Sequence, residues 1–187
     1  MTAVRPGTGL DEDAALTVWQ AAEAGAGRRS GGTRAQRVRA RLRSPAALLL
    51  VAERDGGDGR TPTPVGVLLA ELDRTHGLVV ALLAVDPPAQ CTGVGRALLE
   101  ALLSRYPSAA ARVASDDVAS LGLLAAVGLE QVDTQEQDGW TLWQRPATTA
   151  TTALVGTADV LLEPACGAKG NAAPPEVVGS GCDDGQP

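Results

Sequence analysis

The sequence contains no phenylalanine, and aromatic residues make up only 2% of its 187 residues. Hydrophobic residues nevertheless reach 44%, so alanine, leucine and valine must fill the core. A chain of this length suits one domain with a core of its own. Lysine is also scarce, since one lysine stands against fifteen arginines.

Several classes of protein are excluded by what is missing. No stretch approaches the roughly 18 apolar residues of a membrane-spanning helix, and residues 1–7 lack the apolar region of a signal peptide. Cys91, Cys166 and Cys182 show neither disulfide pairing nor the spacing of a metal site. The net charge of −6 argues against a nucleic-acid-binding surface. We therefore expect a cytoplasmic protein without a metal ion, a nucleic acid or a membrane as partner.

The composition changes after Pro146. Residues 147–187 hold one lysine and five acidic residues among Thr/Ala repeats, glycine and proline. Such a segment buries too little apolar surface to fold. We predict one domain over residues 1–146 and an acidic, low-complexity, disordered tail over residues 147–187.

The most informative segment begins with an uncharged run, Leu78–Val85, that ends before Pro87 and Pro88. A short apolar run bounded in this way is typical of a strand buried on both faces. A helix should follow from Gly95 to the residue before Pro107. Its apolar residues form one stripe, which consists of Leu98, Leu99, Leu102, Leu103 and Tyr106.

Gly93 and Gly95 stand at the entrance of this helix, where missing side chains let backbone N–H groups approach a ligand. The first turn of a helix leaves N–H donors unpaired, and its dipole favours a negative charge. The segment therefore predicts a site for an anion such as a pyrophosphate. It is no Walker A loop, because the one lysine is Lys169, and Leu98 replaces the third glycine of a dinucleotide-binding fingerprint. A glycine-rich connection without a ligand remains an alternative.

The loop resembles the acyl-CoA loop of the GNAT acyltransferase superfamily, Gln/Arg-x-x-Gly-x-Gly/Ala, since residues 90–95 read Gln-Cys-Thr-Gly-Val-Gly. The flanks, Val85-Asp86-Pro87 and Ala97-Leu98-Leu99, also match the family pattern. The resemblance covers about residues 3–145. It implies a single α/β domain with a mixed, mostly antiparallel sheet flanked by helices, and acetyl-CoA or another acyl-CoA as co-substrate.

The resemblance also implies which residues bind the co-substrate. The strand backbone at Leu83 and Val85 would pair with the pantetheine arm. The pyrophosphate would lie on the loop and the first helical turn, which comprise Gln90, Cys91, Thr92, Gly93, Val94, Gly95 and Arg96.

The match weakens further along the chain. Where family members often read Asn-x-x-Ala-x-x-x-Tyr-x-x-x-Gly-Phe, this chain has Asp117, Ser120, Leu124, Gly128 and Leu129. Leu124 stands where the family often has a tyrosine that protonates the departing thiolate, and leucine cannot donate a proton. Either Ser120, one helical turn earlier, does so, or the thiolate leaves unaided. Ser120 is otherwise a small packing residue.

A general base must accept the proton of an attacking amine. The apolar strand before the loop has no carboxylate, and our first candidate is Glu71, near the end of the preceding apolar strand. Glu71 as the solvated end of that strand is the alternative. Asp73 and His76 are further candidates nearby.

Seven arginines lie between Arg28 and Arg43. They form either an electropositive lip that attracts an acidic substrate or the CoA phosphates, or a solvated helix face. Arg28 and Arg29, in a predicted loop, are the better functional candidates.

The resemblance thus predicts acyl transfer from acetyl-CoA to a primary amine of a small molecule or peptide by direct attack. The alternative is a catalytically reduced module that binds CoA or a partner. The acceptor, the acyl length and the oligomeric state, including a homodimer, stay open.

Overall fold

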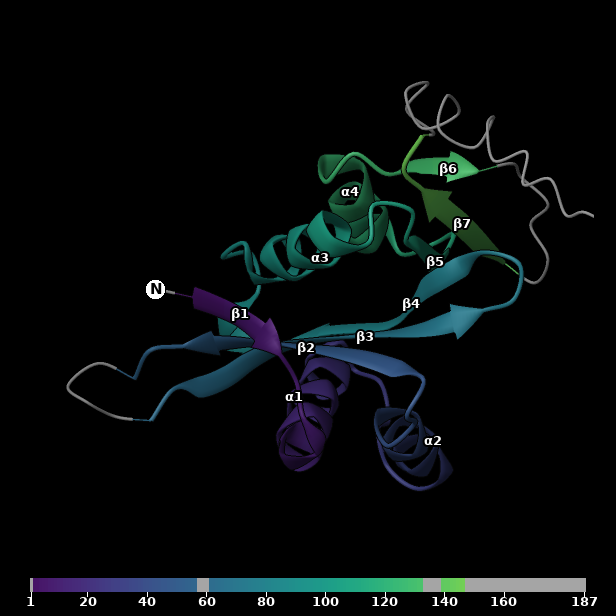
Figure 1. The fold of residues 1–187 in the computed structure, drawn as a ribbon. Helices are drawn as coiled ribbons and strands as arrows, with labels where there is room; N and C mark the ends of the chain where they lie inside the picture. Colours follow the sequence, from purple (N-terminus) through teal and green to yellow (C-terminus); the bar gives the residue numbers. More distant parts are fainter. Residues whose placement is uncertain (1, 57–60, 133–138, 147–187) are drawn as a thin grey trace, which may run out of the picture. The chain divides into compact units, whose positions relative to one another are not determined.

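In the computed structural model, which describes residues 2–56, 61–132 and 139–146, seven strands form one sheet in the order β1-β2-β3-β4-β5-β7-β6 (Figure 1). The strands are β1 Thr2–Pro6, β2 Ala47–Arg54, β3 Thr63–Asp73, β4 Gly77–Val85, β5 Ala110–Ala114, β6 Glu130–Val132 and β7 Trp140–Gln144. Neighbours are antiparallel except β4 and β5, which are parallel. The predicted mixed, mostly antiparallel sheet is confirmed. The tail of residues 147–187 lies outside the described residues.

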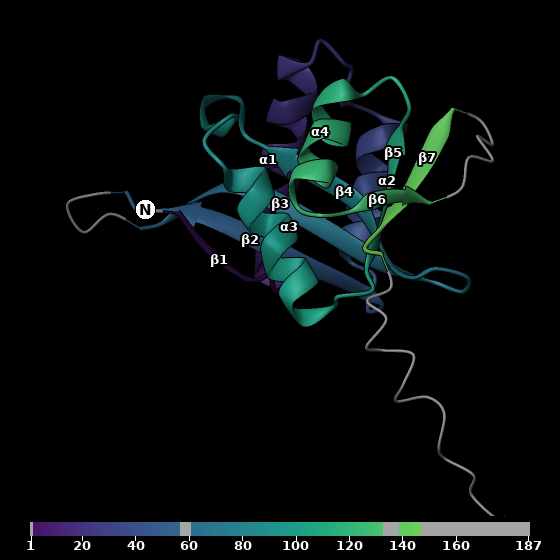
Figure 2. The same cartoon turned by 90° about the horizontal axis from the view of Figure 1, so that it is seen from above.

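Helices cover both faces of the sheet (Figures 1 and 2). They are α1 Glu12–Gly25, α2 Thr33–Leu42, α3 Val94–Arg105 and α4 Val118–Ala126, with short 3-10 turns η1 Gly9–Asp11 and η2 Pro87–Ala89. Helices α1 and α2 pack on one face, and α3 and α4 lie on the other. None of the helices in the described part of the chain is long and apolar enough to cross a membrane.

The alternation of side chains along β2 and β3 builds two cores. Leu50 and Leu68 pack with α3 on one face, whereas Leu49 and Val67 pack with α1 on the other. Each fully buried side chain of this size contributes about 1.5–3 kcal/mol. Aliphatic residues, together with the buried Trp19, therefore replace the missing aromatic core.

Strand β4 differs from the prediction in its second half. Its pairing with β5 is limited to Val79↔Ala110 and Val80↔Ala111, and the two strands part beyond that point. Residues 81–83 are consequently only half-buried. The prediction of burial on both faces is wrong for residues 81–83, because β3 pairs with one edge of this half while β5 leaves the other edge open.

The stripe of helix α3 also needs one correction. Leu98, Leu99, Leu102 and Leu103 are buried as predicted, but Tyr106 is 43% exposed. It follows the last helical residue, Arg105, and its φ of −131° has left the helical region. Its side chain therefore no longer follows the stripe.

Candidate active site

The unpaired edge of β4 offers backbone groups to a ligand. The Asp86 N–H donates to the Val65 carbonyl on β3 at 2.9 Å. Because successive residues of a strand point their backbone groups to opposite edges, those of Val85 and Leu83 face away from β3. The Val85 carbonyl accepts a hydrogen bond from Gln90 Nε2 at 3.1 Å. Leu83 has no strand partner on this edge among the described residues, so an extended ligand can pair with it.

The loop after β4 turns the N-terminus of α3 toward this open edge. Gly93 caps the helix with a φ of +88°, a left-handed conformation that glycine adopts without strain. The N–H groups of the first turn have no intrahelical partner. No other backbone acceptor in the described ranges takes those of Val94, Gly95 and Arg96. These donors and the helix dipole suit an anion.

Gly95 keeps the space beside the helix open. A Cβ atom at this position would lie 3.2 Å from Leu123 Cδ2 and 3.7 Å from Val85 Cγ2. The space belongs to a cavity of about 470 Å³, here called the loop cavity. Of the residues predicted to bind the co-substrate, those that line it are Leu83, Val85, Gln90, Cys91, Gly93, Val94, Gly95 and Arg96.

Thr92 is the exception among the predicted loop residues. It is absent from the lining of the loop cavity, and its hydroxyl donates to the Ala89 carbonyl at 2.7 Å. Its side chain therefore stabilises the turn that presents Gly93.

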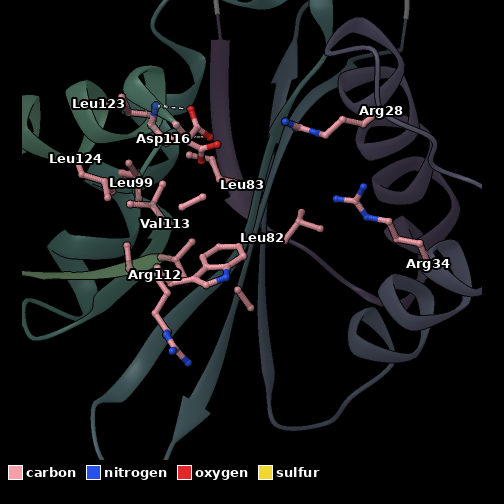
Figure 3. Close-up of a pocket in the computed structure, with 17 residues that line it drawn as sticks. Arg28, Arg34, Leu82, Leu83, Leu99, Arg112, Val113, Asp116, Leu123 and Leu124 are labelled. Atoms are coloured by element: carbon pink, nitrogen blue, oxygen red, sulfur yellow. Dashed lines mark hydrogen bonds between the residues drawn. The ribbon is translucent and has the colours of Figure 1, made fainter. Parts of the chain in front are cut away.

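A second cavity of about 350 Å³, here called the sheet cavity, lies where β4 and β5 part (Figure 3). Leu82 and Leu83 of β4 form its floor, with Leu123 and Leu124 of α4 on one side and arginines from the α1–α2 region on the other. Five residues line both cavities, namely Arg28, Leu83, Asp117, Ser120 and Leu123. A ligand in one cavity can therefore meet a ligand in the other at this junction.

Asp117 and Ser120 bring polar groups to the junction. Asp117 caps α4, and its Oδ1 accepts from the Ser120 N–H at 3.1 Å. Its Oδ2 accepts from the Ser120 hydroxyl at 2.8 Å. Leu124, one turn later, lines the sheet cavity with an apolar side chain. Asp116 adds an exposed carboxylate to the same cavity.

Glu71 lies at the other end of the sheet. The β3–β4 register pairs it with Val79, whereas Gly66 pairs with Val85, the residue nearest the loop. Six residues of β4 separate these points, or about 20 Å. Glu71 lines neither cavity, and its carboxylate binds the Arg41 guanidinium at 2.8 Å. This position speaks against a role as base.

Asp73 and His76 lie at the same distant end and line neither cavity. The backbone N–H groups of His76 and Thr75 donate to Asp73 and hold the pKa of that carboxyl below its usual value. Asp73 therefore stabilises the turn.

The arginines divide into two groups. Arg39, Arg41 and Arg43 pair with acidic residues outside both cavities, as a solvated helix face would. Arg28 and Arg34 instead line the sheet cavity (Figure 3). The loop candidate Arg29 lines neither cavity.

Glu23 of α1 holds the two cavity arginines. Its carboxylate accepts from Arg28 Nε at 3.1 Å and Nη2 at 3.0 Å, and it pairs with Arg34 Nη1 at 2.6 Å. Glu23 is only 5% exposed. The Arg34 guanidinium also lies over the buried Trp19 ring, 5.7 Å from its centroid. We call Glu23, Arg28 and Arg34 the Glu23 cluster.

Glu23, Arg34 and Asp116 had no individual role in the site predicted from the sequence, although Arg34 is one of the seven arginines considered there as an electropositive lip. Glu23 follows Trp19 by one helical turn, and this spacing placed it on the packed face of α1. An acidic residue on an apolar face signals a buried partner, and that signal could have drawn attention to the arginines.

Comparisons with known proteins identify the family and the fold. The family model described as "Acetyltransferase (GNAT) family" matches residues 15–129. No curated protein matches the sequence.

Several solved structures share the fold. The ribosomal-protein-S18-alanine N-acetyltransferase of Escherichia coli is 18% identical with a TM-score of 0.60, over 78% of this chain and 93% of that chain. The PaiA N-acetyltransferase of Thermoplasma acidophilum, solved in complex with coenzyme A, is 14% identical with a TM-score of 0.59. The match covers 78% of this chain and 98% of that chain. A GNAT-family acetyltransferase of Bacillus cereus is 13% identical with a TM-score of 0.60, and the match covers 78% of this chain and 98% of that chain.

Proposed function

The chain belongs to the GNAT acetyltransferase family, and from this premise we propose that it transfers an acyl group from CoA to a primary amine. The acyl group is acetyl, and the acceptor is a small molecule or peptide that attacks directly. The observation that carries this proposal is the junction of two cavities, one beneath an anion-binding helix terminus and one open to an acceptor.

The co-substrate supplies the thioester and is held largely by backbone groups. The N–H groups from Gly93 to Arg96 bind the pyrophosphate. Arg96 adds a positive charge, with its Nε anchored on Glu100 at 2.7 Å. The pantetheine arm pairs with Leu83 as an added strand along the open edge of β4. The reacting carbonyl then lies near the junction of the cavities.

In the reaction the amine nitrogen bonds to the carbonyl carbon while the carbon–sulfur bond breaks. The amine proton passes to a base, a role for which Asp116 is better placed than Glu71 because it lines the sheet cavity. The thiol of the leaving group has a reference pKa of about 8.5, so its thiolate departs without a strong acid. The Ser120 hydroxyl, which donates to Asp117 Oδ2 in the structure, turns away from that carboxylate to donate toward the departing sulfur.

A second candidate function is a module that binds CoA or a partner without catalysis. Leu124 favours it, because an apolar side chain lines the sheet cavity where a family tyrosine often donates a proton. Strand β4 also has no ionisable side chain. Turnover separates the two functions, since both require the loop cavity.

The test combines acetyl-CoA binding by calorimetry with CoA release against a panel of amines. We expect micromolar binding by the wild type, and its loss in the double variant Gly93→Asp with Gly95→Asp. Gly31→Asp is the control, because a side chain there meets nothing within 4 Å. Steady CoA release with an amine supports the enzyme, and binding without release supports the module. A folded wild type that does not bind acetyl-CoA would contradict both.

A further inference from the structure

We infer that the acceptor carries a carboxylate close to its amine, as an amino acid does, and that Arg34 and Arg28 bind this carboxylate. The inference rests on the proposed acyl transfer and names the substrate class. Its basis is the charge of the Glu23 cluster, the fixed position of Arg34 and the distribution of charge across the sheet cavity.

The Glu23 cluster has one positive charge in excess. Two guanidinium groups share a single buried carboxylate, so one carboxylate is missing from a balanced set. Arg34 uses Nη1 on Glu23, and its Nε and Nη2 have no hydrogen-bond partner among the described residues. The planar guanidinium thus keeps donors on two nitrogens, which matches a carboxylate bidentately.

Arg34 is held in place before any acceptor arrives. Trp19, only 4% exposed, supports the guanidinium from α1, and Glu23 fixes one of its nitrogens. A stacked and ion-paired arginine loses less side-chain freedom on binding than a free one. Its side chain is still 51% exposed and therefore accessible from the cavity.

The position of Arg34 separates its ligand from the co-substrate. Arg34 lines the sheet cavity and not the loop cavity, whereas Arg28 lines both. The helix terminus that suits the pyrophosphate belongs to the loop cavity. The anion facing Arg34 is therefore part of the acceptor.

Opposite charges face each other across the sheet cavity. Figure 3 shows Arg28 and Arg34 on one side and Asp116 on the other, with Leu82 and Leu83 between them. Arg112 also lines the side of Asp116, but its guanidinium points away from that carboxylate. An ammonium group favours the Asp116 side, and a carboxylate favours the arginines. A volume of about 350 Å³ suits a small molecule of amino-acid size. A diamine would place a second positive charge against the guanidinium groups.

The test compares amine pairs that differ in one carboxylate, namely lysine with 1,5-diaminopentane, arginine with agmatine, and tyrosine with tyramine. We expect kcat/KM to be at least about tenfold higher for the amino acid of an accepted pair. Arg34→Gln should bring the ratio close to one and leave the Kd of acetyl-CoA unchanged. The two amines of a pair differ in basicity, but this difference affects the wild type and Arg34→Gln equally. The change in the kcat/KM ratio between the two proteins therefore reports on the carboxylate. Arg37→Gln, an exposed substitution on the same helix, is the control and should keep the wild-type ratio.

Several outcomes would overturn the inference while acyl transfer stands. They are equal or better turnover of the decarboxylated amines, turnover of acidic peptides alone, or a loss of acetyl-CoA affinity in Arg34→Gln.

A binding measurement distinguishes this failure from the failure of the proposed function. If no amine is acetylated, calorimetry with CoA compares N-acetyl-tyrosine with N-acetyl-tyramine. Tighter binding of the carboxylated compound that disappears in Arg34→Gln supports the anion site and contradicts acyl transfer. Equal binding, or none, overturns the inference as well.

Discussion

Two arginine–carboxylate clusters in this domain have opposite ratios of guanidinium groups to carboxylates. In the first, here called the Arg5 cluster, one guanidinium binds two carboxylates, with Arg5 nitrogens 2.7 and 2.9 Å from Asp11 and 2.6 Å from Glu53. Asp11 also accepts from the Thr8 N–H at 2.8 Å and is only 8% exposed. The cluster joins β1, η1 and β2 and lines neither cavity.

In the Glu23 cluster, one carboxylate binds two guanidinium groups beside a cavity. Removing Arg5 leaves the Asp11 and Glu53 carboxylates without a positively charged partner among the described residues, whereas removing Arg34 still leaves Glu23 bound by Arg28. The proportion of charges therefore separates a cluster that holds the fold together from one that keeps donors for a ligand.

The largest expected effect is the loss of stability in Arg5→Gln. Breaking a buried pair costs about 3–5 kcal/mol. Because the Arg5 side chain is 39% exposed, solvent screening reduces the expected loss to about 2–3 kcal/mol. Arg34→Gln should change the free energy of unfolding by less than about 1 kcal/mol. Urea denaturation measures the free energy of unfolding of both variants. Equal losses would contradict the different roles assigned to the two clusters.

The Arg5 cluster should also make stability depend on acid. Hydrogen bonds from Arg5 hold the pKa of the Asp11 carboxyl well below its usual range, although burial opposes this shift. Since the unfolded-state pKa is about 3.9, the unfolded state binds the proton first. The contribution of the ionised Asp11 carboxylate to the free energy of unfolding is full above about pH 5, and it is lost progressively as the pH falls through about 4 and below.

Asp11→Asn tests this dependence. Its unfolding curve should lie below that of the wild type at neutral pH and approach it as the pH falls to about 3. Asp13→Asn, at an exposed carboxylate, should follow the wild type. A constant difference between wild type and Asp11→Asn at all pH values would contradict the assignment.

Asp117 and Ser120 form a second polar group that, like the Glu23 cluster, lies at the cavities. Ser120→Ala removes a hydroxyl at the junction, and we expect kcat to fall by up to about tenfold with the Kd of acetyl-CoA unchanged. Ser104→Ala on α3, whose hydroxyl donates to the Ala101 carbonyl at 2.9 Å, is the matched control. An unchanged kcat in Ser120→Ala would mean that this serine only packs and that the thiolate leaves unaided.

The smallest effect is expected at the Arg41–Glu71 pair. Both side chains belong to an exposed ion pair outside the cavities, so Glu71→Gln should alter the free energy of unfolding by less than about 0.5 kcal/mol. Acyl transfer should be unchanged. A large fall in kcat would restore Glu71 as the base.

Local patterns predicted the elements because helices and strands follow from periodicity and from the residues that interrupt it. The run Leu78–Val85 between Gly77 and Pro87 became β4, and the leucines after Gly95 became the buried side of α3. The loop residues were also predictable, since they are contiguous in the chain. The turn between β4 and α3 alone places these residues at the loop cavity.

The role of Glu71 depended on the direction of strand pairing. In an antiparallel pair the end of β3 lies beside the start of β4, and therefore far from the loop that follows β4. Closeness in sequence to an apolar strand was a poor guide to closeness in space.

The sequence by itself determined the order of the elements, the position of the Gly93–Gly95 loop before α3 and the family, because these depend on neighbouring residues and contiguous motifs. Only the tertiary structure decided that the second half of β4 is open, since this requires β5 to part from it after Val80. It also brought Arg34, which Glu23 holds, and Asp116 to one cavity from separate parts of the chain. Contacts between distant residues arise from packing, which no local pattern encodes.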